Sequence, residues 1–136
     1  MYEGLTKLIP ELDHADKPGN VRGRSGGTIH RPLEVEFEIR IEDFVRDHPE
    51  AGLTHYADIL ERSGIAWSAE SMEAADASYL DGQTVMALLV GAMRAERFSY
   101  GIFLEFLRSG AVKRWLERLR QIDLGNEAQP KGGLDV

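Results

Sequence analysis

A mainly α-helical single domain, built as a small helical bundle, is the fold class that this sequence predicts. Residues 82–98 are apolar on nearly every face, residues 111–122 carry one apolar stripe, and the connections between the last helices are short. A helix that is apolar all round belongs in a core, and short connections make consecutive helices pack as neighbours. We expect one domain over residues 1–124 and a flexible C-terminal tail over 125–136.

The central helix is expected over residues 82–98, with Asp81 as its N-cap. A second helix is expected near 100–109 and ends at Gly110, since glycine is favoured just past a helix C-terminus. The last helix covers residues 111–122. The residues expected to form the core are Val85, Leu88, Leu89, Met93, Phe103, Phe106, Leu107, Trp115, Leu116 and Leu119.

The N-terminal part reads as a short helix followed by a long loop. Apolar residues in 2–12 recur at helical spacing, and Pro10 predicts a kink or a stop. Residues 13–32 are rich in glycine and form the expected loop. Further on, Thr54 and Gly64 predict a helix over 55–63, and Ser68 predicts the N-cap of a short helix over 69–75.

Residues 34–42 fit two patterns. Apolar and polar residues alternate strictly, which favours an extended piece over 34–39 and allows one short β-strand or hairpin near 28–40. This strand would pair with residues 28–33 or with its copy in a second protomer. Phe37, Ile41, Phe44 and Val45 also fit a helical stripe. We expect the strand first, then a short helix ending at Pro49.

Composition excludes several classes of site. The 136 residues include no cysteine, which excludes disulfide frameworks, thiolate metal sites and cysteine nucleophiles. The net charge of −7 disfavours a broad nucleic-acid surface. No apolar run approaches the roughly 20 residues of a membrane span, and the N-terminus lacks the pattern of a signal peptide. A cytoplasmic protein of bacterial type, with no membrane contact, is the expectation.

The charges are unevenly distributed along the chain. Residues 34–50 are strongly acidic and residues 94–120 are strongly basic. Such a chain is expected to place the two regions against each other, either within one molecule or between two.

Arg94, Glu96 and Arg97, at the end of the central helix, form the main candidate site. Arg94 and Arg97 share a helix face and are able to hold a phosphate or carboxylate between them. Tyr100 and His55 are the further candidate ligand-binding residues. The alternative is structural, because cations stabilise a helix C-terminus and Glu73, Asp76 and Glu105 are available as ion-pair partners.

The segment 80–123 resembles the signature half of an uncharacterised bacterial domain-of-unknown-function family. The resemblance rests on an apolar helix followed by Arg94, Glu96, Arg97, Phe98, Gly101 and Gly110. It is weaker over LTKLIPEL and over residues 32–44. Ser99 departs from the pattern, in which Cys or another small residue is expected. The resemblance implies a shared fold and assigns no activity, substrate or catalytic residue.

Other motifs give weaker signals. His14, His30, His48 and His55 show no metal-ligand spacing, so neither a metal nor a cofactor is expected. The glycine-rich loop matches no phosphate-binding motif. A helix-turn-helix reading of the last helices is opposed by the overall acidity and by Glu117 within the basic face.

The sequence therefore leaves two functional hypotheses of different class. The first is a non-enzymatic interaction or regulatory module that self-associates, with another protein as the second choice of partner. The second is a small-molecule or anion-binding domain, with or without enzymatic activity, that uses Arg94, Glu96 and Arg97. DNA binding ranks third.

Overall fold

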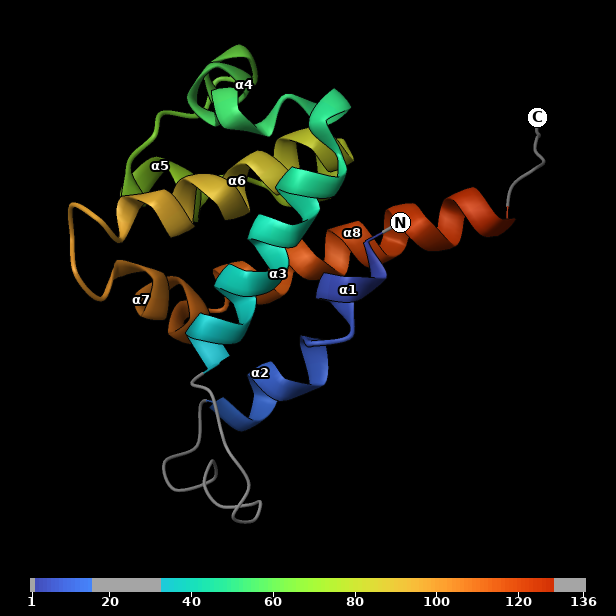
Figure 1. Ribbon diagram of the computed structural model, residues 1–136, viewed down its shortest axis with the longest axis horizontal. Coiled ribbons are helices and arrows are strands. Elements are labelled where there is room, and N and C mark those ends of the chain that lie inside the picture. Colours follow the sequence, from blue (N-terminus) through green and yellow to red (C-terminus); the bar gives the residue numbers. More distant parts are fainter. Residues whose placement is uncertain (1, 16–32, 129–136) are drawn as a thin grey trace.

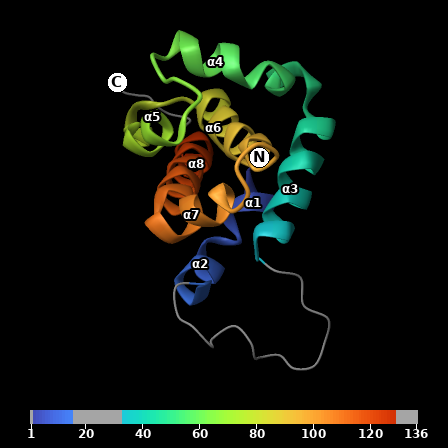
Figure 2. The same cartoon turned by 90° about the vertical axis from the view of Figure 1, so that its left-hand side faces the viewer.

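The computed structural model describes residues 2–15 and 33–128, and this part of the chain is all-α, with no strand. Its centre is helix α6 (Gly82–Ala95). Helices α3 (Leu33–Asp47), α4 (Tyr56–Arg62), α7 (Ile102–Ser109) and α8 (Ala111–Ala128) all pack against α6. Figure 2 shows α6 in the middle of this ring of helices, and Figure 1 shows α8 extending toward the C-terminus.

Helix α6 forms the interior of the bundle, as the sequence predicts. The Asp81 carboxylate accepts a hydrogen bond from the Thr84 backbone N–H at 2.8 Å, which caps the first turn. Every residue from Thr84 to Met93 is buried, whichever side of the helix it occupies. The ten residues expected to form the core are all buried too, and they come from α6, α7 and α8.

Helices α6, α7 and α8 differ from the prediction mainly in where they end. Gly110 ends α7 with φ +93°, as expected of a glycine C-cap. Helix α6 stops at Ala95 rather than 98, because the next backbone N–H groups bond to carbonyls three residues back in tight turns. Helix α8 continues to Ala128, six residues beyond the predicted end at 122.

The strand expected over residues 34–39 is wrong, because these residues belong to helix α3. Phe37, Ile41 and Phe44 point into the core, whereas Ile39, which the alternating pattern would bury, is 37% exposed. Packing against α6 and α7 therefore selects the helical stripe over the alternating one. The proposed hairpin partners at 28–32 lie outside the described residues.

The N-terminal segment forms two short helices, α1 (Glu3–Thr6) and α2 (Ile9–Ala15). Pro10 lies in the first turn of α2, where a missing N–H is tolerated, so the break comes before the proline rather than at it. The Tyr2 backbone N–H donates to the Asp123 carboxylate at 2.8 Å and ties this end of the chain to α8. The remainder of the predicted loop, residues 16–32, lies outside the described residues.

The segment between α3 and α6 crosses the bundle in short pieces. Two 3₁₀ helices, Pro49–Ala51 and Leu53–His55, lead into α4. Thr54 is not the N-cap, since it lies inside the second of these and His55 precedes α4. Ser68 does cap α5 (Ala69–Ala74), accepting from the Ser71 N–H at 3.2 Å. A third 3₁₀ helix, Ala77–Tyr79, precedes α6.

None of the helices in the described ranges combines the length and the apolar character that crossing a membrane requires.

Candidate functional site

Glu96 holds the connection between α6 and α7 in shape. One carboxylate oxygen accepts a hydrogen bond from the Gly101 N–H at 2.7 Å, and the other accepts one from the Phe103 N–H at 3.0 Å. These donors belong to the first turn of α7, whose N–H groups have no partner within the helix. Gly101 itself has φ +90°, a left-handed conformation that suits glycine. Glu96 therefore acts as the cap of α7.

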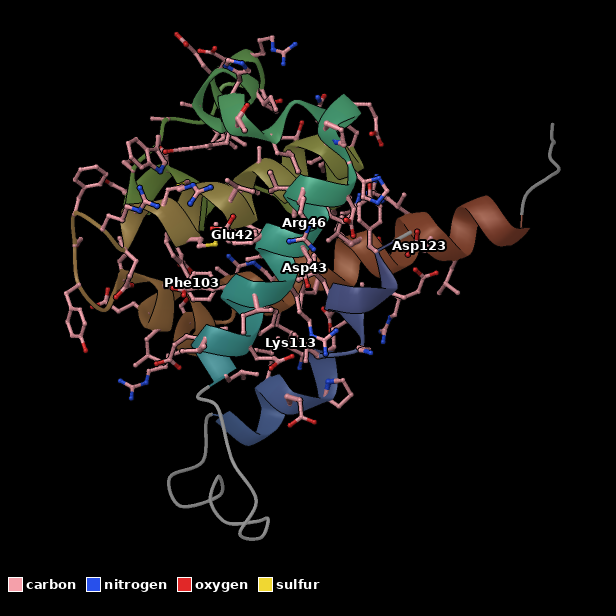
Figure 3. All side chains as sticks on the ribbon, in the orientation of Figure 1. Glu42, Asp43, Arg46, Phe103, Lys113 and Asp123 are labelled. Carbon is pink, nitrogen blue, oxygen red and sulfur yellow. The ribbon has the colours of Figure 1, made fainter. Side chains whose placement is uncertain are left out.

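Arg94 is engaged by a different partner from those the sequence suggested. Its guanidinium donates to the Glu42 carboxylate on α3 at 3.1 Å. Figure 3 shows Glu42 on α3 beside the C-terminal part of α6. Glu73 instead pairs with Arg114 of α8, at 3.5 Å. The contact between Arg94 and Glu42 places the acidic and basic regions against each other within one molecule.

The surroundings of Arg94 are acidic. Burial raises the pKa of the Glu38 carboxyl above its ordinary value of 4.5, and the carboxylates of Glu96, Glu42 and Glu34 raise it further. Because Arg94 already pairs with Glu42 and other carboxylates lie nearby, the negative charge here opposes the binding of an anionic ligand to Arg94. The hypothesis of a paired-arginine anion site therefore depends on Arg97.

Arg97 and Tyr100 lie on the connection between α6 and α7, and both are exposed. Within the described ranges, neither the Arg97 side chain nor the Tyr100 side chain makes a hydrogen bond or an ion pair. His55 is exposed at the start of α4, and no described contact joins it to the arginines or to Tyr100. The structure thus places Glu96, Arg97 and Tyr100 on one connection, with Arg94 in the last turn of α6 before it, and leaves His55 on another element.

An apolar pocket opens beside this connection, and sequence reasoning missed it. Its volume is about 220 Å³, and its walls come from α5 with the segment before it, from the end of α6, and from α7. The lining residues are Trp67, Ser68, Ala69, Met72, Ala95, Phe98, Ser99, Ile102 and Phe106. Apart from two serines, every lining side chain is apolar or aromatic.

Trp67 forms one wall of the pocket and is fixed by α6. Its indole N–H donates to the Gly91 carbonyl at 2.9 Å. A Cβ atom on Gly91 would lie 3.3 Å from both the Trp67 ring and the Met72 side chain. Glycine inside a helix costs about 1 kcal/mol relative to alanine, so Gly91 within the apolar run was the sequence signal of a close approach.

Three aromatic side chains make the pocket and its edge unusually apolar for a surface. Phe98 is 79% exposed, Tyr100 is 98% exposed and Trp67 is 39% exposed. Trp67 and Phe98 contact each other edge to face, with ring centroids 6.0 Å apart. We call Trp67, Phe98 and the pocket, together with Tyr100 two residues after Phe98 on the same connection, the aromatic face. Figure 1 shows the connection that carries Phe98 and Tyr100 at the left-hand end of the molecule, opposite the C-terminal end of α8.

Comparison of the chain with family models, curated proteins and solved structures gives no match. The resemblance to a bacterial domain-of-unknown-function family therefore stays a prediction. Among the described residues, no three histidine or carboxylate side chains gather as metal ligands would. The case for a function comes from the geometry of the aromatic face.

Proposed function

We propose that this protein is a non-enzymatic interaction module that self-associates through the aromatic face. The observation that carries the proposal is the exposure of Phe98, a wall of an apolar pocket, and of Tyr100, two residues later on the same connection. With Trp67 they expose about 450 Å² of ring surface, taking 150–250 Å² for each whole side chain. Contiguous apolar patches of several hundred Å² on soluble proteins commonly mark interaction sites.

The structural basis for self-association differs from the strand pairing and charge asymmetry that the sequence suggested. Pairing of strands no longer supports it, because residues 33–47 are helical. At least one contact between the acidic and basic regions is internal. The support is now the aromatic face and its charges: Glu70 follows the lining residue Ala69, and Arg97 precedes Phe98. A face that carries both signs does not repel its own copy as a single-signed one would.

Size-exclusion chromatography with light scattering, run from low micromolar to millimolar protein, tests the proposal. We expect the mean mass to rise toward that of a dimer as concentration increases, and Phe98→Ser to move this rise to higher concentration. Leu124→Ser is the matched control, since Leu124 is an exposed apolar residue on α8. A monomer mass at every concentration and salt level would overturn the proposal.

A second candidate function is the binding of a small aromatic anion. The observation in its favour is that exposed Arg97 adjoins Phe98, a wall of the pocket. An apolar pocket with one cation at its edge suits a ring that bears a carboxylate. A thermal-shift titration with benzoate and with inorganic phosphate tests it. Benzoate should raise the Tm of the wild type and leave Arg97→Ala unchanged; no shift in either protein removes this candidate.

A further inference from the structure

We infer that the pocket of one copy receives the Tyr100 side chain of a second copy, in a reciprocal two-fold exchange. This inference rests on the proposed function and adds to it the residue that fills the pocket. In such a dimer, each protomer contributes one Tyr100 and one pocket, so the same face serves as donor and acceptor.

Tyr100 is the side chain on this face that is free to enter a second copy. Phe98 and Trp67 are themselves walls of the pocket, so neither can leave without destroying it. Tyr100 is 98% exposed and is not among the lining residues. It lies two positions after Phe98 on a connection held in place by Glu96, so its backbone is positioned before any partner arrives. Such preorganisation lowers the entropic cost of binding.

The size and chemistry of the pocket fit one phenol ring. An apolar cavity of about 150 Å³ is enough to hold a benzene molecule, and this pocket measures about 220 Å³. Pockets for drug-sized ligands start near 300 Å³. A buried tyrosine hydroxyl needs a hydrogen-bond partner, and the hydroxyls of Ser68 and Ser99 are the polar side chains in the lining.

The available area sets how tight this dimer is. The exposed rings offer about 450 Å² per copy, whereas a standard interface buries about 800 Å² per partner. The exchange therefore produces a weak dimer, in which one central aromatic anchor carries most of the affinity. Removal of that anchor should weaken the dimer far more than removal of any other exposed ring.

Sedimentation equilibrium of Tyr100→Ser tests the inference. The variant should raise the dissociation constant of the dimer by about 900-fold, because the symmetric dimer loses two aromatic anchors of about 30-fold each. Tyr79→Ser is the matched control, because Tyr79 is 84% exposed but lies before the opposite end of α6, about 20 Å away along that helix. Tyr79→Ser should leave the dissociation constant unchanged.

A mixing experiment tests the reciprocal exchange itself. Ala69→Phe fills the pocket but keeps Tyr100, whereas Tyr100→Ser keeps the pocket but loses its occupant. Each variant alone should be monomeric at concentrations where the wild type dimerises. An equimolar mixture should recover part of the association, with a dissociation constant about 30-fold above that of the wild type, because one of the two contacts between Tyr100 and a pocket forms between the two variants.

The outcomes separate this inference from the proposed function. If the wild type dimerises and Tyr100→Ser dimerises equally well, the exchange is wrong while self-association stands. If both variants fail to dimerise and their mixture also stays monomeric, Tyr100 and the pocket do not contact each other across the dimer. The exchange is then also wrong. If the wild type never dimerises, both proposals fail. Circular dichroism and the Tm of each variant establish that it is folded.

Discussion

Glu96 is the residue on which the shape of the aromatic connection depends. Its carboxylate accepts two backbone N–H groups, from Gly101 and Phe103, in the first turn of α7. We predict that Glu96→Ala lowers the free energy of unfolding by about 1–3 kcal/mol, the cost of leaving such donors unpaired. Glu96→Gln, which retains one acceptor oxygen, should lose less. Denaturation with urea measures both.

Glu105→Ala is the control for this prediction. Glu105 is exposed on the same helix, and its side chain has no hydrogen bond or ion pair within the described part of the chain. If Glu96→Ala costs no more than Glu105→Ala, the assignment of Glu96 as the cap of α7 is incorrect.

Glu38 predicts a dependence of stability on pH. Burial and the carboxylates of Glu96, Glu42 and Glu34 raise its pKa in the folded state above the ordinary value of 4.5. The folded state therefore binds this proton more tightly, and stability falls as pH rises from 4.5 through the raised pKa. Glu38→Gln should increase the Tm at neutral pH, and the increase should vanish at pH below 4.5.

Thermal melts across the acid range check this, with Glu61→Gln as the exposed control on α4. An increase in Tm that is the same at every pH would argue against the charge repulsion as its cause.

Residues that act on their nearest neighbours were the ones that could be predicted from sequence. Asp81 and Ser68 cap the turns that follow them, and the structure confirms both. The role of Glu96 could not be predicted, because its partners come five and seven residues later and reach it only through the left-handed turn at Gly101. The partner of Arg94 is Glu42, on a helix distant in sequence.

At the scale of elements, the contact between α6 and the segment before α5 builds the pocket. We predict that Gly91→Ala changes the free energy of unfolding by less than about 1 kcal/mol, since the gain in helix propensity is offset by displacement of Trp67. Trp67 should nonetheless become more exposed. Acrylamide quenching of tryptophan fluorescence measures this, because Trp115 is fully buried.

Gly125→Ala makes the same substitution in α8, where a new Cβ meets nothing within 4 Å. It should stabilise the protein slightly and leave quenching unaltered. Equal behaviour of the two variants would contradict the close approach of Trp67 to Gly91.

Helix α3 shows why an element could be misassigned although its residues were read correctly. Residues 34–42 satisfy a period of two and a helical period at once. What decides between them is the surface formed by the N-terminal segment with α1, α6 and α7, against which Phe37, Ile41 and Phe44 are buried. Helix α6 had no such ambiguity, because an apolar residue at nearly every position leaves it no solvent-facing side.

At the scale of the whole molecule, the core was predictable and the binding surface was not. The core depends on how many apolar residues each helix carries, which the sequence states directly. The pocket depends on two segments far apart in sequence, residues 67–72 and residues 95–106, meeting at one end of the bundle. Their lining residues read as ordinary core or loop positions until the helices are placed.

The central claim is that copies of this protein meet through the aromatic face. Backbone amide chemical shifts recorded by NMR over a dilution series test it most directly, because they locate the interface residue by residue. We predict that amides of residues 67–72 and 96–102 shift with concentration, while those of α1 and of the C-terminal half of α8 do not. Shifts confined to other helices, or none at millimolar protein, would contradict the account.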